Sequence, residues 1–148
     1  MTGEGAKVGV FVDASVWIAA AGSTTGGSSL VLEICTGQRF TPLCSQRVLQ
    51  EAQTNLRDKL PVEALVRFYR LLATGAPGIV SPVAPEEEIQ YSGIIAEKDA
   101  HVVAAAVRGG AAYLVTLDRK HLANAEVRGA GLPIQILLPG EFINLILH

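Results

Sequence analysis

Apolar residues recur along the chain in short continuous runs, and these runs alternate with longer stretches of helical periodicity. The short runs have the length of strands. The run at residues 111–117 is apolar on both faces, as expected of a strand covered above and below in a parallel sheet. The predicted strands span residues 7–12, 40–44, 79–81, 111–117 and 133–138.

Helical periodicity and capping residues predict the segments between these strands. Ser45 has the position of a helix N-cap, while Gly75, Gly109 and Gly110 have the positions of helix ends. The first predicted helix begins at residue 16, and the others cover residues 30–36, 46–60, 62–74, 86–88, 99–108 and 141–147. We expect a loop over residues 123–131. This alternation predicts a three-layer α/β/α domain over residues 1–148, with a central, mainly parallel sheet.

The composition agrees with one compact domain and indicates the cellular compartment in which we expect the protein. The chain has 148 residues, of which 49% are hydrophobic and 18% are charged. The opening MTGEGAK lacks the apolar core of a signal peptide, and no apolar run approaches the roughly 20 residues that span a bilayer. We therefore expect a cytoplasmic protein without membrane association. Cys35 and Cys44 match no metal-binding spacing, so we expect reduced core thiols, with a disulfide between them as the alternative.

Acidic residues fall where the predicted elements begin and end. Asp13 and Asp118 follow predicted strands, and Asp99 begins a predicted helix, where its carboxylate could cap free backbone N–H groups. Glu51 borders the apolar face of the helix at 46–60. It either leans over the sheet edge or is a solvated partner of Arg47, and spacing alone leaves both possibilities open. Open α/β sheets bind ligands at the carboxyl ends of their strands, where these acids could meet.

Four carboxylates gathered at one site would repel one another, so the cluster predicts a bound cation. Oxygen ligands with little nitrogen or sulfur suit Mg²⁺ or Mn²⁺. The net charge is −2, but without these four acids the other ten face twelve Lys and Arg, which leaves a surface of +2 and does not exclude nucleic acid. Ser15 either caps the following helix, which we expect, or helps to hold Asp13. His101 and His121 have no metal-ligand spacing with each other, so we expect structural roles for both.

Four segments resemble the signature regions of PIN domains in order and spacing. They are VFVDASV, SQRVLQEAQTNL, EKDAHVVAAAV and YLVTLDRKHL, and the third, followed by a strand and TLD, is the most specific. PIN domains include the ribonuclease toxins of VapC-like toxin–antitoxin pairs. The resemblance implies a PIN-like fold and an acidic metal site of Asp13, Glu51, Asp99 and Asp118, with Ser15 and Thr116 as supporting polar groups.

The resemblance also implies a function and partners. We expect metal-dependent, endonucleolytic hydrolysis of RNA, in which divalent ions activate water for attack on phosphorus. Asp13, Asp99 and Asp118 are the expected primary ligands, and Glu51 is a further ligand or orients the water. Three basic residues beside the acids are candidate phosphate contacts or simply solvated charges, namely Lys98, Arg119 and Lys120. A cognate antitoxin is a possible partner. We also expect a homodimer. The helix at 62–74 has apolar residues away from its main apolar face, including Phe68 and Leu71, and the tail is apolar as well.

Two other functional classes are consistent with acids at strand ends. A receiver-like phospho-acceptor domain also binds Mg²⁺, but it requires a carboxylate pair at the first strand and a lysine after a late strand, and neither is evident here. A noncatalytic RNA- or protein-binding module could keep the fold and the acids without cutting RNA.

Overall fold

The computed structural model describes residues 7–148, which form a five-stranded parallel sheet flanked by helices on both faces. The strand order is β3-β2-β1-β4-β5, and every pairing is parallel. The strands are β1 (Val8–Val12), β2 (Phe40–Ser45), β3 (Gly78–Val80), β4 (Tyr113–Val115) and β5 (Gln135–Leu137). The predicted fold class is therefore confirmed. The expectation drawn from the opening MTGEGA lies outside the described residues.

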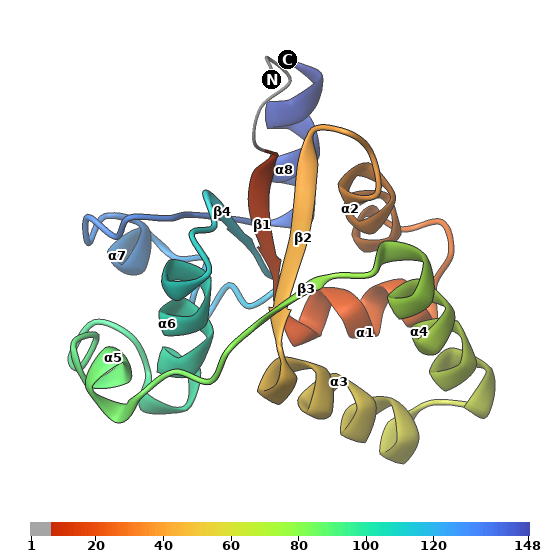
Figure 1. Cartoon of the computed structure of the whole chain (residues 1–148), viewed down its shortest axis with the longest axis horizontal. Helices are drawn as coiled ribbons and strands as arrows, with labels where there is room; N and C mark the ends of the chain where they lie inside the picture. The colour runs from red at the N-terminus through yellow and green to blue at the C-terminus, as the bar shows by residue number, and fades with distance from the viewer. Residues whose placement is uncertain (1–6) are drawn as a thin grey trace.

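Helices cover the two faces of the sheet in separate groups (Figure 1). The first group is α1 (Ala14–Gly22), α2 (Gly27–Cys35), α3 (Gln46–Lys59) and α4 (Val62–Gly75), which pack on one another, with α8 (Pro139–Leu147) against α2 and β5. The other group is α5 (Pro85–Ile89), the 3₁₀ turn η1 (Glu97–Asp99), α6 (Ala100–Arg108) and α7 (Ala125–Arg128). None of the helices within residues 7–148 is both long and apolar enough to cross a bilayer.

The core lies between the sheet and both helical layers. The central strand β1 contributes Val10, Phe11 and Val12, all fully buried, and Trp17 of α1 packs edge-to-face on Phe68 of α4. Burial on this scale is what holds the strand ends, and so the acids that follow them, in fixed places.

Both cysteines lie in this core as free thiols. Burial raises the pKa of Cys35 and of Cys44 to about 12, so neither thiol ionises near neutral pH. The expectation of reduced core thiols is therefore confirmed, and the alternative disulfide is wrong.

Element boundaries differ from the sequence prediction in two informative places. Strand β4 ends at Val115 rather than at 117, because the Leu117 side chain is 43% exposed and its N–H donates to Ser15 Oγ instead of to a neighbouring strand. The predicted loop at 123–131 contains the short helix α7. A four-residue helix has no periodicity to detect, and it is held here by Asn124 Oδ1, which accepts from the Val127 N–H.

Helix α4 packs through a different face from the one expected. Ala64 and Phe68 are buried, whereas Val62, Val66 and Tyr69 lie on the exposed side. We expected Phe68 to lie off the packed face, and this was wrong because Phe68 fits against the Trp17 ring. The exposed apolar stripe of this helix is therefore Val62, Val66 and Tyr69.

The glycine pair after α6 turns the chain into β4, as predicted. Gly109 is the C-cap, and Gly110 has φ of +71°, in the left-handed region.

We expect Gly110→Ala to lower the free energy of unfolding by about 1 kcal/mol, because a Cβ is disfavoured at this φ even though the space is open. Urea unfolding measures the change. Gly75→Ala is the matched control, since Gly75 is helical, has open space and no positive φ; an equal loss in both variants would contradict the explanation.

Candidate metal centre

Asp13 is the first acidic residue at the carboxyl edge of the sheet. It follows β1 and is the N-cap of α1, and its Oδ1 accepts from the Ala14 N–H at 2.8 Å. Its Oδ2 accepts from Thr116 Oγ1 at 2.7 Å and from Ser15 Oγ at 3.3 Å. The expectation that Ser15 caps this helix is therefore wrong, because Asp13 occupies that position. The alternative, that Ser15 helps to hold Asp13, agrees with the geometry.

Thr116 connects two of the predicted site residues. Its side chain is fully buried, and its Oγ1 donates to Asp13 Oδ2 while accepting the Asp118 N–H at 3.0 Å. This contact exists because β1 and β4 pair side by side, with Val12 opposite Val115. A single hydroxyl thus fixes the carboxylate after β1 relative to the backbone after β4.

The Asp13 carboxylate is charged at a cost to the fold. Its side chain is almost fully buried, and this desolvation raises its pKa, with a further increase from the negative charge of Asp99. The hydrogen bonds from Thr116, Ala14 and Ser15 act in the opposite direction but do not cancel the burial. A cation beside this group would favour its ionised form.

Asp118 begins a tight turn just beyond β4, and the turn positions His121. Asp118 Oδ1 accepts the His121 N–H at 2.9 Å, and the Asp118 carbonyl accepts the Ala123 N–H at 2.8 Å. The imidazole then folds back, so that His121 Nδ1 lies 3.3 Å from Asp118 Oδ2. Local hydrogen bonding therefore orients both the carboxylate and the ring.

Asp99 reaches the same point from the opposite helical layer. It ends η1 and precedes α6, and because the 3₁₀ turn already covers the start of the helix, its side chain makes no capping hydrogen bond. The expected capping role is thus wrong. Among residues 7–148, Asp99 Oδ2 is buried without a hydrogen-bond partner; it lies 3.8 Å from His121 Nδ1 and 4.0 Å from Lys98 Nζ. Partial burial raises the pKa of Asp99, Lys98 and His121 lower it, and Asp118 raises it.

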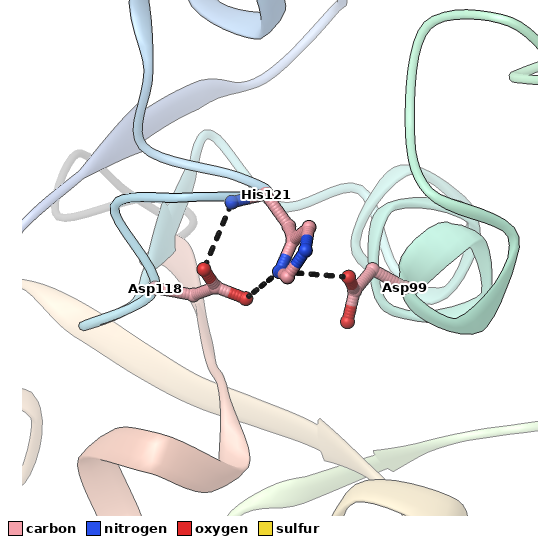
Figure 2. A group of neighbouring side chains, drawn as sticks. All are labelled: Asp99, Asp118 and His121. Atoms are coloured by element: carbon pink, nitrogen blue, oxygen red, sulfur yellow. Dashed lines mark hydrogen bonds and ion pairs between the residues drawn. The ribbon is translucent and has the colours of Figure 1, made fainter.

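Asp99, Asp118 and His121 form one compact group, with the imidazole lying between the two carboxylates (Figure 2). One ligand atom from each residue lies within 4.8 Å of the others. The structural role expected for His121 therefore misses its place in the site. The available signal was the D-x-x-H spacing from Asp118, because residues three apart on a turn share a side.

Glu51 lies on α3 at the border of this group rather than within it. Its side chain is exposed, and its pKa is raised by partial desolvation and then by the charges of Asp13 and Asp99. Arg47 pairs with Glu88 at 3.7 Å, so the alternative Arg47–Glu51 pair is wrong. Glu51 is therefore near enough for the charges of Asp13 and Asp99 to raise its pKa, but it lies outside the compact group.

The three candidate phosphate contacts and His101 lie outside the compact group. Lys98 is close to Asp99, and Arg119 and Lys120 are exposed beside Asp118. His101 is buried in α6, and desolvation, with the nearby charge of Arg47, lowers its pKa to about 4. A buried, neutral imidazole agrees with the structural role expected for it.

The residues present fit a divalent cation. The Asp99 Oδ2 atom is a buried hydrogen-bond acceptor that a cation would satisfy. Asp118 Oδ2 and His121 Nδ1 are further ligand atoms close to it. Desolvation, and to a lesser extent the neighbouring negative charges, raise the pKa values of Asp13, Glu51 and Asp99, and a bound cation would oppose both effects. Asp99, Asp118 and His121 can hold the ion, with Asp13 and Glu51 nearby.

Comparisons with known proteins agree with this fold. A sequence profile of the PIN domain family matches residues 9–120. VapBC2 from Rickettsia felis, bound to a DNA fragment from their promoter, has a TM-score of 0.63 at 16% identity, over 88% of this chain and 98% of that chain. PAE2754 from Pyrobaculum aerophilum has a TM-score of 0.60 at 18% identity, over 95% and 91%. At these identities the likeness shows the fold alone. No curated protein sequence matches significantly.

Proposed function

Because this chain belongs to the PIN domain family, we propose that it is a metal-dependent endoribonuclease. The observation that carries the proposal is the compact group of Asp99, Asp118 and His121 around the buried Asp99 Oδ2 atom, which has no hydrogen-bond partner among residues 7–148. Family membership supports a nuclease, and the acidic cluster suits a divalent ion. RNA as the substrate and internal cleavage are the finer parts of the proposal.

Each acidic residue has a separate role in this proposal. Asp99 and Asp118 bind the ion, and Asp13, fixed by Thr116 and Ser15, adds negative charge at the end of β1. A bound Mg²⁺ or Mn²⁺ would act as a Lewis acid on the scissile phosphate and would help to activate water. Glu51 is exposed and its pKa is raised, so it is suited to orient that water and accept its proton.

The surroundings offer contacts for a phosphate backbone. Lys98, Arg119 and Lys120 are exposed and adjacent in sequence to Asp99 and Asp118, and we propose that they bind phosphates on either side of the scissile bond. A cavity of about 330 Å³ lies at the same sheet edge and is lined in part by Arg47, Gln50 and His101. Its hydrogen-bonding groups are suited to an unstacked base next to the cleaved phosphate.

The test is cleavage of single-stranded RNA by the purified chain with Mg²⁺, with Mn²⁺ and with a chelator. We expect internal cleavage only when metal is present, because the carboxylates alone cannot activate water at neutral pH. Cleavage that persists in chelator would contradict the mechanism. RNA binding without cleavage in either metal would favour a noncatalytic module. Phosphorylation of an Asp by acyl phosphate and Mg²⁺ would instead favour a receiver-like domain.

Metal should stabilise the fold more at neutral than at acidic pH. The pKa values of Asp13, Glu51 and Asp99 are raised, so these three groups bind more protons in the folded apoprotein than in the unfolded chain, and their contribution to stability is lost as pH rises above about 4. Metal needs the ionised carboxylates. We expect saturating Mn²⁺ to raise Tm by about 5–10 °C near neutral pH and by much less near pH 5. Differential scanning fluorimetry measures both; equal rises would argue against a carboxylate site.

Two protein partners follow from the same proposal. We propose a small antitoxin that blocks the acidic site, and co-purification with the product of a neighbouring reading frame tests it.

We also propose a homodimer, since apolar side chains of α4 and α8 are exposed, namely Val62, Val66, Tyr69, Leu145 and Leu147. Sedimentation that shows only monomer at micromolar concentration would contradict the dimer.

A further inference from the structure

We propose that His121 is a nitrogen ligand of the metal, and that it makes the centre select Mn²⁺ over Mg²⁺. The proposal rests on the metal centre described above, but it does not depend on RNA being the substrate. It changes the donor set that the acids alone imply from oxygen only to mixed oxygen and nitrogen.

Distances place His121 as a ligand rather than a distant neighbour. His121 Nδ1 lies 3.3 Å from Asp118 Oδ2 and 3.8 Å from Asp99 Oδ2. Two ligand atoms at right angles, each about 2.1 Å from an ion, are about 3.0 Å apart, and tetrahedral ligands are slightly farther apart. The two separations from His121 Nδ1 therefore need only a small contraction around an ion.

The direction of the ring agrees with this role. Nδ1, rather than Nε2, faces the Oδ2 atoms of both carboxylates (Figure 2). With its proton on Nε2, the imidazole presents the Nδ1 lone pair to the region that both acids share. The backbone N–H of His121 holds Asp118 Oδ1, which leaves Asp118 Oδ2 to the site. The turn thus orients two ligands together.

A simple ion pair explains the arrangement less completely. A protonated imidazole would pair with Asp118, but Asp99 Oδ2 remains buried without a hydrogen bond at 3.8 Å from the ring. The Lys98 ammonium is also at 4.0 Å, beyond hydrogen-bonding distance. One cation between the three ligand atoms would contact all of them.

Nitrogen ligation has a direct consequence for metal choice. Mg²⁺ prefers an all-oxygen octahedral shell, whereas first-row transition metals accept imidazole nitrogen. Mn²⁺ binds both carboxylates and imidazole, so a centre of Asp99, Asp118 and His121 favours Mn²⁺ over Mg²⁺ at equal concentration.

The test measures metal binding directly, with Mn²⁺ alone and Mg²⁺ alone as probes. We compare the wild type with His121→Asn, which puts an amide near the Nδ1 position, and with the matched control His148→Asn at the exposed C-terminus. We expect His121→Asn to weaken Mn²⁺ binding by about tenfold or more, with Mg²⁺ affinity changed less than about threefold. His148→Asn should leave both affinities unchanged.

A spectroscopic measurement keeps the proposal testable if His121→Asn does not fold. Pulsed electron paramagnetic resonance of wild-type protein with bound Mn²⁺ should show coupling to a directly bonded nitrogen. Bound Mn²⁺ without nitrogen coupling, or equal Mn²⁺ affinity in His121→Asn and the wild type, would overturn the inference. Nitrogen coupling without RNA cleavage would support His121 and count against the ribonuclease. Cleavage without nitrogen coupling would do the reverse.

Discussion

Asp99→Asn is expected to reduce metal-dependent RNA cleavage by at least about 100-fold, while the protein stays folded. Asp99 Oδ2 is buried and has no hydrogen bond, so its charge is not needed to complete the fold. Asn has the same shape but no charge, and a neutral amide binds a divalent cation more weakly than a carboxylate does. The loss should therefore appear in metal binding and cleavage rather than in folding.

The measurement is the initial rate on a fluorescent RNA at saturating Mn²⁺ and Mg²⁺, with a chelator blank for each protein. Asp58→Asn is the matched control, because Asp58 is an exposed acid whose one ion pair within residues 7–148 is with its neighbour Arg57, at 3.2 Å. Its rate should remain near that of the wild type. A rate for Asp99→Asn within about threefold of the wild type would remove Asp99 from the metal centre.

Asp13→Asn is expected to change stability and activity in opposite directions. The ionised Asp13 carboxylate is desolvated and close to other negative charges, which is why its pKa is raised. A group with a raised folded-state pKa destabilises the fold as pH rises above the unfolded value, and a neutral amide does not titrate. Without metal near neutral pH, Tm should therefore rise by at least about 2 °C.

The amide can keep the hydrogen bonds at this position. The Asn oxygen can accept from the Ala14 N–H, and its NH₂ can donate to Thr116 Oγ1 and Ser15 Oγ once both hydroxyls rotate. RNA cleavage should nevertheless fall by about 100-fold or more, because negative charge is lost beside the metal. Thermal unfolding in chelator and the RNA assay test the two halves. A lower Tm would show that the charge stabilises the fold, contrary to the direction of the pKa shift.

Residue pattern was sufficient to predict the fold and the placement of two acids at the ends of strands. Apolar runs separated by helical stretches gave the parallel α/β/α arrangement, and the end of each run placed Asp13 and Asp118 at the carboxyl edge. Ser45 as a helix cap and Gly110 as a turn were also predicted correctly, since capping and positive φ depend on a few neighbouring residues. These features are local.

Contacts between distant segments were not predictable from pattern. Phe68 is buried because Trp17 of another helix lies opposite it, although the sequence placed Phe68 off the packed face. Asp99 was expected to cap its helix, but a 3₁₀ turn removes that role. The N-cap of α1 was expected at Ser15, yet Asp13 is the N-cap. The pairing of β1 with β4 brings Thr116 beside Asp13, and the hydroxyls of Thr116 and Ser15 both donate to the Asp13 carboxylate.

The sequence by itself determined the parallel α/β/α fold, because hydrophobic periodicity follows from the order of residues, and its resemblance to PIN domains proposed the four acids of the site. Only the tertiary structure decided which atoms meet. It brought Asp99 of one helical layer to Asp118 beyond β4, placed His121 Nδ1 between them, and left Glu51 at the border. The physical reason is that ligand positions depend on strand pairing and helix packing between segments far apart in the chain, which hydrophobic periodicity does not encode.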